Sequence, residues 1–190
     1  IKQYRDMIIK GGFLTMGSKR IGLARMEALL ENLKRELAMG GATVVGTKAK
    51  VHTVTDSSVT LTEADSGSVY VMSAAGIEFT LPDSGGGDIN GVTYEFVMKT
   101  QGATQKIVCS DTTNEKIQGA LIASDTDSSD AASTWAAELG DSFSSINFAS
   151  VAQGSPGSRV KLTCIGADRW QVEGVVLQSG GSEATPFAAS

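Results

Sequence analysis

Two hydrophobic patterns divide the chain at about residue 41. In "MGSKRIGLARMEALLENLKREL" (16–37) apolar residues recur at spacings of three and four, whereas later residues form short alternating or β-branched runs separated by Gly, Asp, Ser and Pro. The first pattern is typical of an amphipathic α-helix and the second of β-strands joined by turns. The sequence therefore predicts an N-terminal helix within 16–41, followed by a β domain over 42–177.

The apolar seam of the predicted helix has the 3-4-3-4 spacing of a coiled coil, and it consists of Leu23, Met26, Leu30, Leu33 and Leu37. A helix of about twenty residues is marginal alone in water, so the seam needs a surface to cover. That surface is either the chain's own sheet or another molecule. The spacing and a basic flank favour an assembly or anchoring helix, and the flank consists of Lys19, Arg20 and Arg25.

The β region contains ten short runs with turn residues between them, at 50–54, 58–62, 68–72, 77–81, 92–98, 105–109, 116–122, 142–148, 159–164 and 169–175. This rhythm favours a sandwich, barrel or jelly roll, and we expect a β-sandwich or jelly-roll-like domain. Within it, "CIGADRW" predicts a hairpin that turns at Gly166-Ala167-Asp168, with Trp170 as a core anchor.

Two segments break the strand rhythm. "ASDTDSSDAASTWAAELG" (123–140) is long for a connection, and we expect an insertion that contacts a neighbour, with one short helical turn at "WAAEL". The end of the chain, 178–190, is rich in Gly, Ser and Ala and predicts a flexible tail.

The net charge of −5 is unevenly distributed. Residues 1–40 hold eight basic and four acidic residues, whereas 41–190 hold eight and seventeen. A basic end can be attracted to an acidic surface while an acidic domain stays solvated and repels its copies. The alternative is a solvated helix face without a partner. No apolar run is long enough for a membrane span.

Residues with catalytic or metal-binding chemistry are few. His52 is the single histidine and is expected to be structural. "GDSFS" (140–144) lacks the glycines of a hydrolase nucleophile loop, and the glycine-rich 83–91 lacks the Lys-Ser or Lys-Thr of a phosphate loop. "DTDSSD" (125–130) lacks the glycine and final Glu of an EF-hand. We therefore expect no enzyme activity, metal or cofactor.

The two cysteines, Cys109 and Cys164, lie in apolar alternating runs. Without a cluster of histidines they cannot complete a zinc tetrahedron. We expect two reduced thiols in the core.

The first fifteen residues raise the question of where the native protein begins. "KGG" (10–12) can be encoded by a purine-rich ribosome-binding sequence, and Phe13-Leu14-Thr15 would give a spacer of about nine nucleotides before Met16. One hypothesis is therefore that 1–15 are a leader and that Met16 is the start. The other is a longer precursor cleaved before Ile1.

A family resemblance extends from Met16 to about residue 177. "MGSKRIGLARMEALLENLKREL" resembles the opening of small virion structural proteins of marine bacteriophages. "VTLTEADSGSVYVMSAAGIEFTLP", "GVTYEFVM", "EKIQGALI" and "RWQVEG" are similar to the β module that those proteins share with other phage head and tail appendages. The 123–140 insertion and the "NFASVAQGSPGS" connection depart from that module, so contacts through these loops do not carry over.

The resemblance implies a non-enzymatic virion component, a capsid decoration or cement protein. It would bind the major capsid protein on the outer capsid surface after synthesis in the host bacterial cytoplasm. Together with the helix, it leads us to expect a homotrimer, because a symmetric oligomer spreads a weak contact over several shell subunits. Neither nucleic acid nor a membrane is an expected partner. The alternative is a head-fibre or tail-fibre component that binds a receptor or glycan through Tyr70, Trp135 or Trp170.

Overall fold

A computed structural model describes residues 22, 25–32, 49–85, 89–127 and 132–190. The chain divides into two compact units, Ile1–Thr47 and Lys48–Ser190. In the first unit, residues 25–32 are helical, which agrees with the predicted helix where the structure describes it. Predictions for residues 1–15, and for most of 16–41, lie outside the described residues.

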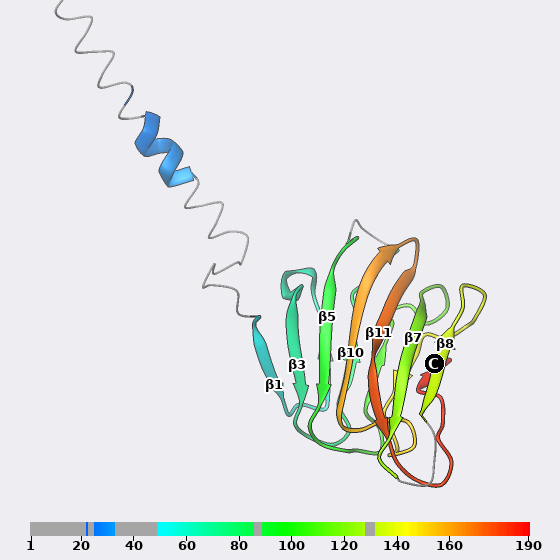
Figure 1. Cartoon of the computed structure of the whole chain (residues 1–190). Helices are drawn as coiled ribbons and strands as arrows, with labels where there is room; N and C mark the ends of the chain where they lie inside the picture. Colours follow the sequence, from blue (N-terminus) through cyan, green and yellow to red (C-terminus); the bar gives the residue numbers. More distant parts are fainter. Residues whose placement is uncertain (1–21, 23–24, 33–48, 86–88, 128–131) are drawn as a thin grey trace, which may run out of the picture. The chain divides into compact units, whose positions relative to one another are not determined.

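The second unit is mainly β, as predicted, and contains two mixed sheets (Figure 1). The strands are β1 (Val51–Val54), β2 (Ser58–Thr60), β3 (Ser68–Met72), β4 (Glu78–Thr80), β5 (Thr93–Met98), β6 (Lys106–Val108), β7 (Lys116–Asp125), β8 (Ser133–Ala137), β9 (Ser145–Asn147), β10 (Ser155–Gly166), β11 (Arg169–Gln178) and β12 (Phe187–Ala188). A 3₁₀ turn, η1, spans Glu63–Asp65. Each of the ten predicted runs overlaps one of these strands.

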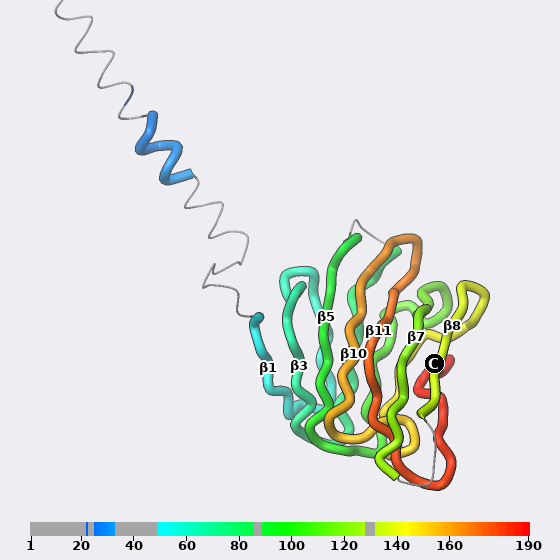
Figure 2. The backbone as a smooth tube through the Cα atoms, in the orientation of Figure 1, coloured from blue at the N-terminus to red at the C-terminus, as the bar shows by residue number. Residues whose placement is uncertain are grey.

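One sheet has seven strands in the order β1-β3-β5-β10-β11-β7-β8, and the other has five in the order β12-β9-β6-β4-β2. From β1 to β6 the chain alternates between the two sheets, so that β1, β3 and β5 are parallel neighbours in one and β2, β4 and β6 in the other. Figure 2 follows the backbone through the labelled strands of the seven-stranded sheet. Parallel pairing follows from these crossings, because a chain that returns from the other sheet runs in its previous direction.

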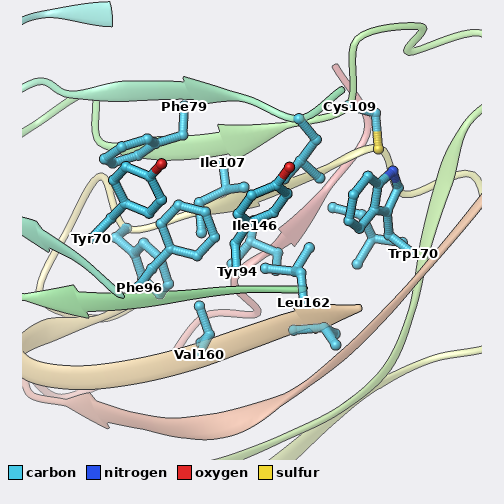
Figure 3. Close-up of a cluster of buried hydrophobic side chains, with 14 of the residues drawn as sticks. Tyr70, Phe79, Tyr94, Phe96, Ile107, Cys109, Ile146, Val160, Leu162 and Trp170 are labelled. Atoms are coloured by element: carbon cyan, nitrogen blue, oxygen red, sulfur yellow. The ribbon is translucent and has the colours of Figure 1, made fainter. Parts of the chain in front are cut away.

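The inward faces of both sheets share one hydrophobic core. Trp170, Phe79 and Ile107 are completely buried, and Tyr94 and Phe96 are 1% exposed. Figure 3 shows these side chains interleaved between strands of the two sheets. The same apolar contacts therefore hold the two sheets together. In each strand, alternation directs the apolar side chains to one face, and that face lies in this core.

Trp170 and the two cysteines occupy the places that the sequence predicts. Cys109 and Cys164 are buried in the core and are not joined in a disulfide. Trp170 lies beside Cys109, with its indole nitrogen directed toward the sulfur (Figure 3).

The predicted hairpin between β10 and β11 is confirmed. Gly166 pairs with Arg169 across a two-residue turn in which Ala167 and Asp168 have φ of 51° and 60°. Positive φ at both central positions is the geometry of a type I′ turn, whose twist matches that of the flanking strands. The turn joins β10 to β11, and the register of the two strands shifts by one residue between Gly166 and Cys164.

The predicted helical turn at "WAAEL" is wrong, because β8 occupies Ser133–Ala137 and pairs antiparallel with β7. The Trp135 side chain packs against the core, and its indole N–H donates to Gln178 Oε1 at 3.1 Å. Alternation places Ala137 in the core as well. Packing against the core therefore overrides the helix propensity of the two alanines.

The flexible tail predicted for 178–190 is also wrong. Phe187 is 3% exposed, and β12 pairs antiparallel with β9. The buried Gln178 amide donates to the carbonyl oxygens of Ala152 and Ala184, which fastens the segment that leads to β12. The composition of 178–190 predicted flexibility, but the buried Phe187 ring and the hydrogen bonds of the Gln178 amide order this segment.

Candidate interaction surface

The outward face of the seven-stranded sheet carries a largely apolar row that crosses five strands. The register of β3, β5, β10, β11 and β7 aligns Val71, Val97, Arg159, Val175 and Ile122. Ile122 is 57% exposed and Val175 is 44% exposed. With strands about 4.8 Å apart, the row is about 19 Å long. The outward side of a sheet that buries its other face is ordinarily polar, so this row needs an explanation.

A charged row lies directly beside the apolar row. In it, Glu95, Lys161 and Glu173 occupy neighbouring positions on β5, β10 and β11. Lys161 Nζ lies 3.4 Å from Glu173 Oε1. Arg159 reaches diagonally to Glu95, with Nε 2.6 Å from Oε1 and an Nη2 donor 2.7 Å from Oε2. This hydrogen bonding raises the pKa of Arg159.

The two rows together form a shallow depression of about 520 Å³. Its lining includes Glu95, Arg159, Lys161, Glu173, Ile122 and Val175. The four charged groups comprise two acids and two bases, so this surface has no net charge although the domain is acidic. The residues of these two rows are together called the outward face.

The corresponding face of the five-stranded sheet is polar. One cross-strand row consists of Ser58, Glu78, Lys106 and Asn147, in which Lys106 Nζ lies 3.1 Å from Glu78 Oε2. This alternation of buried and polar positions is typical of a sheet face in contact with solvent. The seven-stranded sheet thus carries an apolar row on its outward side, whereas the row described on the five-stranded sheet is polar.

The predicted assembly helix is exposed where the structure describes it. Met26 is 62% exposed and Leu30 is 61% exposed, and Leu29 beside the seam is 67% exposed. Arg25 of the basic flank is exposed too. The remaining predicted residues, Leu23, Leu33, Leu37, Lys19 and Arg20, lie outside the described residues.

Two of the three aromatic residues considered for glycan binding are buried. Tyr70 is 4% exposed and Trp170 is 0% exposed, so neither provides an aromatic platform. Tyr70 instead stacks on His52, with ring centroids 4.9 Å apart and an interplanar angle of 11°. Trp135 is half-buried and bonded to Gln178.

In the described part of the acidic segment, 125–127, the aspartates are tied to the chain by their own hydrogen bonds. Asp127 Oδ2 accepts from the Gly180 amide at 2.9 Å, and Asp125 Oδ1 accepts from the Asp127 amide. Across the part of the chain that the structure describes, no group of three or more His, Cys, Asp or Glu side chains is placed to hold a metal ion.

A buried carboxylate is the polar feature that sequence reasoning missed. Glu115 is 0% exposed, and it accepts hydrogen bonds from Ser84, from the Ser110 hydroxyl and from the Asp111 amide. Burial opposes its ionisation, but these donors outweigh burial and hold its pKa below the ordinary value. The side chain joins loops that are distant in sequence, so no local pattern marks it.

Comparisons with protein-family models, with curated proteins and with solved structures give no match to this chain. Among the described residues, no helix is both long and apolar enough to cross a bilayer.

Proposed function

We propose that this chain is a non-enzymatic structural protein of a bacteriophage particle, a capsid decoration protein that oligomerises through its N-terminal helix. It would bind the major capsid protein on the outer surface of the head and stabilise the shell. The β unit, with two sheets around one core, is then a β-sandwich or jelly-roll-like module that follows the assembly helix in the chain.

The observation that carries the proposal is the exposed apolar side of the helix. Met26 and Leu30 are spaced four residues apart on the predicted seam, and both are more than 60% exposed. A helix of about twenty residues, as the sequence predicts, is marginal alone in water. Association of several copies would bury these side chains. The family resemblance supplies the phage context, and the basic flank gives the helix the opposite charge to the β domain.

The competing function, glycan binding by a fibre, is less well supported. It requires an exposed aromatic platform, whereas Tyr70 and Trp170 are buried. Copy number discriminates the two functions. A decoration protein should be present at on the order of hundreds of copies per head, because it occupies symmetry-related sites on the shell, whereas a tail component is far rarer.

Sedimentation equilibrium of the full chain tests the assembly role. Leu30→Glu places a charge in the seam, and we expect it to lower the oligomer mass. Ala28→Glu is the matched control, because position 28 lies opposite the seam on the same helix and should leave the mass unchanged. Equal masses for wild type and Leu30→Glu would contradict assembly by this helix.

Particle binding tests the anchoring role. A chain that lacks residues 16–40 should no longer bind purified heads of the parent phage, while the β unit keeps its circular dichroism spectrum. Retained binding by a folded deletion variant would show that the shell contact lies in the β unit.

A further inference from the structure

We propose that the outward face of the seven-stranded sheet is a second association surface, on which two copies of this chain pack about a two-fold axis. This contact goes beyond the proposed function, because it involves the β unit and needs no contribution from the helix. A two-fold contact joins copies in pairs, whatever number of helices the N-terminal assembly contains.

The strand register defines where the axis would lie. An axis parallel to the strands, between β10 and β11, exchanges each position on β10 with the position beside it on β11. Lys161 is paired with Glu173 in the register, so Lys161 of one copy lies opposite Glu173 of the other, and the reverse contact forms at the same time. Each copy therefore supplies the opposite charge at both points of contact.

The same axis matches the apolar row to itself. Val97 on β5 and Ile122 on β7 are equally far from the axis in the strand order, so they lie opposite each other across the interface. Arg159, held by Glu95, lies opposite Val175, where its aliphatic stem can cover the valine. Val97 and Ile122 thus meet as apolar groups, Lys161 meets Glu173, and Arg159 contacts Val175 through its aliphatic stem.

Charge explains why a second copy fits this face. Residues 41–190 hold seventeen acidic and eight basic residues, so β units repel one another over most of their surface. The two acids and two bases of the outward face have no net charge, and the repulsion is least there. An acidic or basic partner would lack the alternating complement of the pair Lys161 and Glu173, which a rotated copy provides.

The first test uses the full chain with Leu30→Glu, in which the helix seam is disrupted. Sedimentation equilibrium should give a concentration-dependent dimer for this variant. A monomer at every concentration would overturn the proposal and leave helix assembly intact. Conversely, if Ile122→Glu alone converts the otherwise wild-type chain to a monomer, the sheet contact stands and assembly by the helix fails.

The second test reverses charges in that Leu30→Glu chain. Lys161→Glu places two carboxylates opposite each other, and Glu173→Lys places two ammonium groups opposite each other. Each change should weaken the dimer about ten-fold or more. An equimolar mixture of the two variants should associate again, because every cross-copy contact in the heterodimer then joins opposite charges.

Lys106→Glu is the matched control, since it reverses the lysine of an equivalent ion pair on the five-stranded sheet. It should not change dimerisation, and the circular dichroism spectra of all variants should agree. Failure of the mixture to associate would overturn the proposal. A chain that stays monomeric but binds phage heads in a manner sensitive to Lys161→Glu would also overturn it, and would identify the shell as the occupant of this face.

Discussion

Ser84 and Glu115, thirty-one residues apart, are joined by two hydrogen bonds in the interior: the Ser84 amide and hydroxyl both donate to Glu115 Oε1, at 2.6 and 2.5 Å. Glu115 Oε2 accepts from the Ser110 hydroxyl and the Asp111 amide, each at 2.8 Å. The carboxylate therefore connects the loop after β4 to the loop before β7. Four donors around one ion are a strong constraint on this end of the domain.

Glu115→Gln should destabilise the β unit by about 1–3 kcal/mol, because an amide NH₂ would face donors that the carboxylate now accepts from. Urea denaturation at neutral pH, followed by fluorescence, measures the change. Glu63→Gln, in an exposed position on η1, is the control and should lie within about 0.5 kcal/mol of wild type. Equal stability of the two variants would show that the Glu115 network contributes little.

The same network predicts a pH dependence. The pKa of Glu115 is lowered in the fold from its ordinary value of 4.5, so its stabilising effect is complete above that value. It is lost as the pH falls through the folded-state pKa. The stability difference between wild type and Glu115→Gln should therefore narrow on acidification, and a constant difference from neutral to strongly acidic pH would contradict this assignment.

Phe187→Ala should show that the C-terminal segment is part of the fold. The ring is 3% exposed and lies 5.7 Å from Phe143, centroid to centroid. Its removal should cost about 3–5 kcal/mol, measured by urea denaturation. Ala189→Ser, two residues further on and exposed, should have no effect. A loss below about 1 kcal/mol would mean that β12 separates readily from β9.

Cys109 should be inert toward thiol reagents in the folded protein. Burial, with the nearby Glu115 charge, raises its pKa to about 12, so almost no thiolate forms at pH 8. We expect a maleimide to label neither native cysteine until urea is added. Thr60→Cys, exposed on β2, provides a reactive control in the same protein. Rapid labelling of Cys109 without denaturant would indicate local opening of the core around Trp170.

The sequence patterns predicted the positions of the strands better than they predicted which strands pair with each other. Alternation identified ten of the strands, because one face of each is buried, and the positions of Gly and Asp identified the β10–β11 turn. Alternation does not show which strand lies beside which, so the crossings between sheets and the parallel pairs were not predicted. The outward face was missed for the same reason: Val97, Val175 and Ile122 form a row only after the register is known.

The helix seam is the opposite case. Its residues are close together in sequence, so spacing alone indicated an apolar side, and Met26 and Leu30 are indeed exposed where the structure describes them. Phe187 and Trp135 were misjudged because their surroundings are built from distant segments. Both segments are rich in small and polar residues, and the predictions of a helical turn and a flexible tail depended on that local composition. Contacts with the core decide the conformation of the two segments instead.

The β10–β11 turn offers a way to strengthen the fold without touching its core. Ala167 has φ of 51°, a region that costs an L-residue with a Cβ about 1 kcal/mol and that asparagine tolerates better. Ala167→Asn should therefore raise the free energy of unfolding by about 0.5 kcal/mol, and Ala167→Val should lower it by at least 1 kcal/mol, because a β-branched side chain fits this region poorly. Ala103→Asn is the matched control, since Ala103 is exposed in a turn and has no positive φ. If Ala167→Asn and Ala167→Val were equally stable in urea denaturation, the positive φ at Ala167 would not carry the energetic cost assigned to it.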